Sequence, residues 1–343
     1  MTRKSKQSFL SICSIGALMA DDVSALGERR RLTDSRLRAV HNRLQQLGVE
    51  TLLGEEACIY ATGSIGRGES CEFSDLDVFI VSEVSGGLGA ARSIAFNIVI
   101  DRLIEVAHEL EFPPFSKDGE YLKAHPLNEL IGHLGTREDD HTNVFTARML
   151  LLLESRSVLG DVVYDRALAA VVETYWRDFV GNEENFVPVF LTNDINRYWK
   201  VLCLSYEAHG DDTPQERRLR NYKLKHSRLL TCYSAILYLA WVLRARNTVT
   251  PDDAVAMTRL SPTERLEFIA RDPVLAPQAK RLLAMYSKFL GTVNAPKQEL
   301  LGRFADSAYH VSRRTEARAF GDAIFLLLKQ LAEPTELLRF LLV

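Results

Sequence analysis

The chain has 343 residues, 47% of them apolar, which is enough to bury a substantial core and to form two domains. Its formal net charge of −3 argues against a protein whose whole surface coats nucleic acid, although local basic patches are compatible with it. The five cysteines are scattered without the spacing of a metal site. Their odd number fits reduced, buried thiols in a cytoplasmic protein.

The N-terminal segment loosely imitates a secretory signal, because Arg3, Lys4 and Lys6 precede an apolar stretch from residue 9 to residue 20. Serines and a glycine interrupt that stretch, and its cleavage pattern is imperfect, so we expect a helix packed on the fold instead. No run approaches the roughly 18 continuous apolar residues that span a membrane. We therefore predict a cytoplasmic protein with no membrane partner.

Two elements are predicted ahead of the main motif. Residues 21 to 50 should form a charged amphipathic helix, and residues 57 to 62 (ACIYAT) are apolar and typical of a β-strand. That strand should end at the turn Gly63-Ser64. The apolar positions expected on one face of the helix are Leu37, Val40, Leu44 and Leu47.

The turn at Gly63 has the composition of a phosphate-binding loop. Gly63 lets the backbone approach a ligand without a Cβ in the way, and Ser64 offers a hydroxyl and an N–H to a phosphate oxygen. Arg67 adds a guanidinium that can grip a phosphate in a bidentate manner. A Walker-type phosphate loop is disfavoured, because no Gly-Lys-Ser/Thr follows the strand. An ordinary hairpin with a glycine-rich turn is the structural alternative.

A second strand is predicted from Asp75 to Val81. Since side chains alternate along a strand, Asp75 and Asp77 should point to one face, about 6–7 Å apart. Such a pair suits Mg²⁺, or Mn²⁺ in its place, because a hard cation takes carboxylates and completes its shell with phosphate oxygens and water. Two metal ions held in this way can activate an attacking hydroxyl and stabilise a leaving pyrophosphate.

The pattern Gly63-Ser64, ten intervening residues and Asp75-Leu76-Asp77 resembles the signature of the DNA polymerase β nucleotidyltransferase superfamily. The longer form Gly-Ser-x-Gly-Arg-Gly-Glu, which ends at Glu69, is similar to the nucleotidyltransferase part of protein-PII uridylyltransferases and of related bacterial nucleotidyltransferases attached to CBS domains. The resemblance covers residues 55 to 245. It implies that Glu69 belongs to the nucleotide-binding loop with Gly63, Ser64 and Arg67.

The superfamily usually supplies a third carboxylate from a later strand. The corresponding segment of this chain, residues 116 to 125, offers Asp118 and Glu120 as candidate metal ligands, although Asp118-Gly119 is equally typical of a solvated turn. If neither residue reaches the metal ions, the site would rely on two carboxylates or be catalytically weak.

The rest of the chain is predicted to be mostly helical. Residues 88 to 111 show helical spacing, and from about residue 143 the pattern becomes almost wholly helical. Thr250-Pro251-Asp252-Asp253 and Ser261-Pro262-Thr263-Glu264 have the pattern of helix starts. We expect an α+β fold with a small mixed sheet and flanking helices. Three parts are predicted: N-terminal helices (1–50), a nucleotidyltransferase domain (51–145) and a helical domain (146–343).

Residues 217 to 228 hold six Lys/Arg residues and lead into an apolar run, so one helix should pass from a charged end into the core. A catalytic sheet with two acidic groups needs cations on the other side of a triphosphate, and this favours phosphate binding by Arg220 and Lys223. Helical spacing puts both on one face with Ser227. Asn221, Lys225 and Arg228 share another face. Tyr198 or Trp199 could stack a base, although an aromatic residue on an apolar helix is more often part of the core.

These features together predict a Mg²⁺-dependent nucleotidyltransferase that moves a nucleoside monophosphate from an NTP to an acceptor hydroxyl and releases pyrophosphate. No sequence pattern identifies the acceptor, whether it is a protein, an RNA, a small molecule or a nucleotide. One alternative is a signal-nucleotide or oligonucleotide synthase, or a nucleotidylating toxin, of a bacterial defence system. The other is a catalytically weak nucleotide-binding module with a regulatory or antitoxin role, which the unclear third carboxylate motivates.

Overall fold

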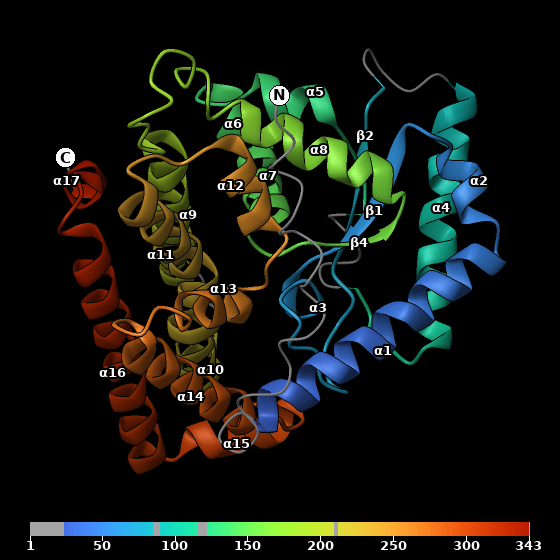
Figure 1. Ribbon diagram of the computed structural model, residues 1–343. Helices are drawn as coiled ribbons and strands as arrows, with labels where there is room; N and C mark the ends of the chain where they lie inside the picture. The colour runs from blue at the N-terminus through green and yellow to red at the C-terminus, as the bar shows by residue number, and fades with distance from the viewer. Residues whose placement is uncertain (1–23, 85–89, 116–121, 209–211, 343) are drawn as a thin grey trace.

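The computed structural model describes residues 24–84, 90–115, 122–208 and 212–342. Asp118, Glu120 and the helix predicted within residues 1–20 lie outside these ranges. The helices that follow α8 lie to one side of a small sheet (Figure 1). In chain order the elements are α1 (Ser24–Gln46), α2 (Val49–Leu53), β1 (Ala57–Ala61), α3 (Gly63–Gly66), β2 (Val78–Ser82), α4 (Ala90–Glu109), β3 (Ala124–Pro126), α5 (Leu127–Gly132), α6 (Arg137–His141), α7 (Val144–Leu153), β4 (Arg156–Leu159), α8 (Asp161–Glu173), α9 (Val189–Ala208), α10 (Pro214–Lys223), the π-helical turn η2 (Leu224–Arg228), α11 (Leu229–Arg246), α12 (Pro251–Thr258), α13 (Pro262–Ile269), α14 (Ala276–Thr292), α15 (Lys297–Ala305), α16 (Ser307–Ala332) and α17 (Leu337–Leu342).

The sheet has four strands in the order β3-β2-β1-β4. Strand β1 pairs antiparallel with both β2 and β4, and β2 pairs parallel with β3, so the predicted small mixed sheet is confirmed. From residue 143 onward the described chain is almost wholly helical, as predicted, and strand β4 is the exception. Four residues are too few to show a strand period, and only the second half of β4 is buried.

Both faces of the sheet are buried, and successive side chains of β1 and β2 enter different cores. Helices α1, α2 and α4 pack over one face, and α5, α7 and α8 belong to the core on the other, which continues into the helical half of the chain (Figure 1). The loop after β1 lies close to the end of α7, where the sheet meets the later helices. Residues Ile59, Ala61, Val78 and Ile80 face the first core, and Cys58, Tyr60, Phe79 and Val81 face the second.

The two helices predicted near the sheet are present with corrections. The helix expected over residues 21 to 50 breaks at Gly48, which adopts a left-handed conformation with φ 70° between α1 and α2. Helix α4 confirms the helix predicted within residues 88 to 111, but two of its apolar side chains, Ile94 and Ile98, are 59% and 36% exposed. A 20-residue helix is about 30 Å long, whereas five-residue strands span only about 17 Å, so the sheet covers part of α4.

The charged helix that was predicted to run into the core is confirmed as a continuous rod of α10, η2 and α11. Among the described residues this rod, Pro214–Arg246, is long and apolar enough to cross a membrane, and 67% of its apolar window is buried inside the protein. Packing against the helices around it accounts for that apolar run. The predicted capping boxes at Thr250 and Ser261 are both formed, and they start α12 and α13.

Candidate functional site

The turn after β1 lies against two other segments at distances that only glycine permits. Gly63 has φ 63°, and a Cβ on it would lie 2.4 Å from Oδ2 of Asp77. A Cβ on Gly66 would lie 1.9 Å from the carbonyl oxygen of Glu154. These two glycines therefore allow the loop to lie directly against an aspartate of the second motif and against the end of α7.

Asp75 and Asp77 precede β2 instead of beginning it, so the strand predicted from Asp75 is shorter than expected. The reason is that β1 ends at Ala61, opposite Val78. One further backbone hydrogen bond, from the Thr62 N–H to the Asp77 carbonyl at 2.8 Å, holds the two motifs together. Both carboxylates line one polar cavity of about 420 Å³, together with Gly63 and Ser64.

The carboxyl group of Asp77 has a raised pKa. Burial, and after it the neighbouring charge of Asp75, raise this pKa from its ordinary value of 3.8 to about 6. Two carboxylates at one end of a polar cavity are a donor set for a hard divalent cation, which would take the place of the proton. Within the described ranges no cluster of three His, Cys, Asp or Glu residues forms a complete metal site. Mg²⁺ bound here would therefore need water and phosphate oxygens as its other ligands.

Metal affinity at this site is expected to depend on pH, because the raised pKa of Asp77 means that the cation must displace a proton in acid. Mn²⁺ affinity should fall about tenfold per pH unit below pH 6 and level off above pH 7, since one proton is released. Titration calorimetry from pH 5 to pH 8 measures this. The residual affinity of Asp77→Asn should show no such slope, and an equal affinity of the unmodified protein at pH 5 and pH 8 would contradict the assignment.

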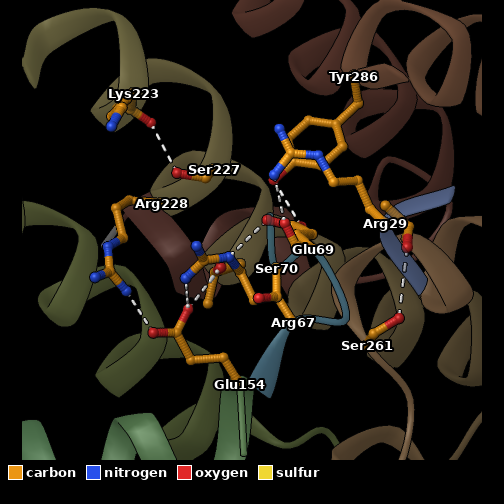
Figure 2. A network of polar contacts seen from close by, with 12 residues as sticks. Arg29, Arg67, Glu69, Ser70, Glu154, Lys223, Ser227, Arg228, Ser261 and Tyr286 are labelled. Carbon is orange, nitrogen blue, oxygen red and sulfur yellow. Dashed lines mark hydrogen bonds and ion pairs between the residues drawn. The ribbon is translucent and has the colours of Figure 1, made fainter. Parts of the chain in front are cut away.

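Arg67 and Glu69, which we predicted to bind nucleotide, are buried and paired with each other (Figure 2). Arg67 donates from Nε to Glu69 at 2.9 Å and from Nη1 to Glu154 at 2.8 Å. Burial alone would lower the pKa of Arg67, but the Glu154 and Glu69 carboxylates raise it well above its ordinary value. The guanidinium predicted to bind a phosphate is thus bonded to two carboxylates of the protein itself. The motif Arg-Gly-Glu therefore stabilises the loop.

The same network ties the loop to the helical half of the chain. The Tyr286 hydroxyl of α14 donates to Glu69 at 2.7 Å. Arg29 of α1 donates to the Glu69 carbonyl and to the Leu290 carbonyl, both at 3.0 Å. Contacts over such long sequence separations fix the loop between α1 and α14 (Figure 2).

Glu154 is a central residue of the site that the sequence analysis did not single out. It follows the last residue of α7, is fully buried, and accepts hydrogen bonds from Arg67, Arg228 and Thr231. Burial would raise the pKa of Glu154, but the charges of Arg228 and Arg67 lower it. A charged residue directly after the apolar run 149–153 was the available signal, because a buried carboxylate requires partners.

The π-helical turn places three side chains of the basic helix on the wall of the polar cavity, namely Lys223, Ser227 and Arg228. In a regular α-helix a residue five positions on is turned by about 140°, which is why Arg228 was expected on a different face. The wider π turn brings it back toward Lys223. Arg220, predicted to share that face, forms an ion pair with Asp212 instead, at 2.5 Å.

Lys223 and Ser64 line this cavity, and no ion pair or hydrogen bond engages their side-chain polar groups among the described residues. Lys223 is exposed on the cavity wall and forms no ion pair within the described ranges. Its crowded position lowers its pKa by desolvation, against the opposing influence of Asp75. The Ser64 hydroxyl is buried and has no hydrogen-bond partner among the described residues, so it is free to meet a ligand oxygen.

A second cavity of about 230 Å³ adjoins the first, and its walls are mainly apolar. The two cavities share Gly63, Asp77 and Arg228, so these residues form the junction between a polar and an apolar compartment. Phe79, Phe115 and Tyr198 contribute aromatic walls to the apolar cavity. A polar compartment beside an apolar one suits a ligand that has one charged end and one uncharged end.

No protein-family model matches this chain, and no curated protein is significantly similar to it in sequence. The geometry therefore carries the interpretation. The fold brings together Gly63, Ser64, Asp75, Asp77 and Lys223 around one cavity. Arg67 and Glu69 also border it, but their charges are engaged within the protein, and Arg220 is paired elsewhere.

Proposed function

We propose that this protein is a Mg²⁺-dependent nucleotidyltransferase with the site architecture of the DNA polymerase β superfamily. One observation carries the proposal: the Gly63-Ser64 turn packs against the Asp75 and Asp77 pair, and Lys223 lies on the same polar cavity without an ion-pair partner within the described ranges. Carboxylates for a cation, a glycine turn for phosphate and an available positive charge are the groups that nucleotidyl transfer requires.

In the proposed reaction Asp75 and Asp77 would hold the cation, whose charge would lower the pKa of the acceptor hydroxyl and stabilise the leaving oxygen. The Gly63 backbone and the Ser64 hydroxyl bind the phosphates. The acceptor oxygen attacks the α-phosphorus, an oxygen–phosphorus bond forms, and the bond from the α-phosphorus to the bridging oxygen breaks. Lys223 and Arg228 stabilise the charge that builds on the departing pyrophosphate, and the acceptor proton passes to solvent.

The proposal and its two alternatives are separated by following the label from each of the four NTPs, labelled at the α-phosphate, with Mg²⁺ or Mn²⁺ and with or without cell extract. Label in protein, RNA or an added small molecule indicates a transferase. Small soluble products formed without extract indicate a signal-nucleotide or oligonucleotide synthase. Cation-dependent NTP binding with no transfer under any condition would overturn the enzymatic reading and support a regulatory module.

Lys223→Ala is expected to weaken the binding of a non-hydrolysable NTP about ten- to a hundredfold, since a charge-assisted contact to phosphate contributes roughly 1.5–3 kcal/mol. Titration calorimetry measures the change. Lys225→Ala is the matched control, because Lys225 lies two residues further along the same rod but is not among the residues that line the cavity. Unchanged NTP affinity in Lys223→Ala, with a loss of RNA binding that has a steep salt dependence, would move this lysine to the acceptor side.

A further inference from the structure

The π turn between α10 and α11 decides which side chains of this rod line the polar cavity. Such a turn holds one residue more than an α-helical turn, so its position along the rod sets the direction of the side chains next to it. We propose that His226 is a positioning residue, which keeps the turn at Leu224–Arg228 and thereby keeps Lys223 on the cavity wall. The inference rests on the proposed function for the role of Lys223 as a phosphate ligand.

His226 lies inside the turn and bonds to the backbone before it. Its Nδ1 lies 2.9 Å from the carbonyl oxygen of Tyr222, four residues back. Backbone N–H groups of a π turn bond five residues back instead of four, so a side chain can bond to this carbonyl oxygen without displacing them. Burial lowers the pKa of His226 to about 4, so the ring is neutral at pH 7. Since its partner is an acceptor, Nδ1 carries the single ring proton.

Two phenylalanine rings hold the imidazole ring in place. Phe289 of α14 stacks on it with the ring centroids 4.6 Å apart and the planes 1° apart, and Phe320 of α16 stacks on it at 5.0 Å. The side chain of His226 is 2% exposed. A shift of the turn along the rod would pull this ring out of the stack, so the stacked ring opposes such a shift.

A second side chain bonds to the backbone of the turn but does not select its place. The Ser227 hydroxyl donates to the Lys223 carbonyl at 3.0 Å, also four residues back. Serine forms this bond in ordinary α-helices as well, and its hydroxyl can rotate to follow a moving backbone. The stacked histidine is therefore the group that ties the turn to one position.

The two helices that flank the turn resist a shift unequally. Helix α11 is buried along most of its length, whereas α10 buries Leu219 and Tyr222 alone. Arg228, directly before α11, is also held by Glu154. Without His226 the turn is expected to move toward the start of α10, which leaves the register of α11 intact. Lys223 would then precede Arg228 by five residues of α-helix, and its side chain would point about 140° away.

The test separates the N–H donor of His226 from its ring. His226→Phe keeps an aromatic ring and removes the donor, whereas His226→Asn keeps a donor near the position of Nδ1 and removes the ring. Titration calorimetry with a Mg²⁺-bound, non-hydrolysable NTP measures binding, and urea unfolding measures stability. His226→Phe should lower NTP affinity about ten- to a hundredfold, as Lys223→Ala does. His226→Asn should be less stable, because the missing ring leaves a cavity, but should bind the NTP nearly as well as the unmodified protein.

His41→Phe is the matched control. Nδ1 of His41 in α1 lies 2.7 Å from the carbonyl oxygen of Val158, and His41 is not among the described residues that line either cavity. Loss of this bond should leave NTP affinity unchanged. An equal loss of affinity in His41→Phe and His226→Phe would overturn the inference, because the effect would then be a general loss of packing.

A double variant shows whether His226 acts through Lys223. If it does, His226→Phe combined with Lys223→Ala binds the NTP no more weakly than Lys223→Ala alone, because the lysine contact is already lost. Losses that add in the double variant, or an unchanged affinity in His226→Phe, overturn the inference. If His226→Phe does not fold, His226→Asn decides: a loss in its folded protein as large as that of Lys223→Ala also overturns it.

A crystal structure of His226→Phe tests the same point without a ligand. The π turn should lie closer to the start of α10, with Lys223 off the cavity wall, and a turn that stays at Leu224–Arg228 overturns the inference. Failure of the proposed function gives a different result, because the unmodified protein would then bind no NTP, whereas the turn would still move in His226→Phe.

Discussion

Asp77→Asn is expected to abolish nucleotidyl transfer and to stabilise the metal-free protein. Burial and the charge of Asp75 raise the pKa of Asp77 from 3.8 to about 6, so the folded state favours the protonated carboxyl. The wild-type protein therefore has this contribution to stability below pH 3.8 and loses it as the pH rises through 6. At pH 7.5 asparagine, which carries no charge, should raise the free energy of unfolding by about 1–3 kcal/mol.

The two effects are measured on one preparation, by urea unfolding in EDTA at pH 7.5 and pH 4 and by pyrophosphate release with Mg²⁺. The stabilisation should be present at pH 7.5 and nearly absent at pH 4. Asp322→Asn, at an exposed position on α16, is the control and should change neither quantity appreciably. A variant that loses activity because it is destabilised at pH 7.5 would show that Asp77 has a structural role only.

Glu154→Ala is expected to destabilise the protein by about 3–5 kcal/mol, because it leaves two arginines without their shared partner. Arg67 is buried, and Arg228 is held beside Asp77 by its contact with Glu154. Activity should fall as well in whatever fraction stays folded, since Arg228 loses its position at the junction of the cavities. Urea unfolding and the rate per folded molecule measure the two losses separately.

The control for this variant is Glu207→Ala. Glu207 accepts from Arg217 at 2.7 Å, but both side chains are more than half exposed. Such a surface pair contributes about 0–1 kcal/mol, so its removal should barely change the free energy of unfolding. A similar small effect for Glu154→Ala would mean that the buried network does not organise the site.

The residues that sequence reasoning found are those that local geometry brings together. Gly63, Ser64, Asp75 and Asp77 lie on two segments joined by the antiparallel pairing of β1 and β2, so their proximity follows from a short stretch of chain. The apolar strand residues on either side reveal that pairing. The positions of the capping boxes could be predicted for the same reason, since each depends on residues three apart.

The other features of the candidate site depend on contacts between residues far apart in the sequence, which no local pattern encodes. Glu154 is 87 residues from Arg67, and Tyr286 is 217 residues from Glu69, so nothing near Arg67 indicates that its charge is already engaged. The π turn cannot be recognised from the sequence either, because one extra residue in a helical turn leaves the composition of the helix unchanged. It brings Arg228 to the cavity wall with Lys223, whereas Arg220, before the turn, pairs with Asp212.

The proposed reaction is tested most directly by comparing one NTP labelled at the α-phosphate with the same NTP labelled at the γ-phosphate. Nucleotidyl transfer predicts that the α label enters the acceptor and the γ label leaves as pyrophosphate, that both require Mg²⁺ or Mn²⁺, and that both disappear in the double variant Asp75→Asn, Asp77→Asn. Transfer of the γ label, its release as single phosphate, or undiminished α transfer by the double variant would contradict the account.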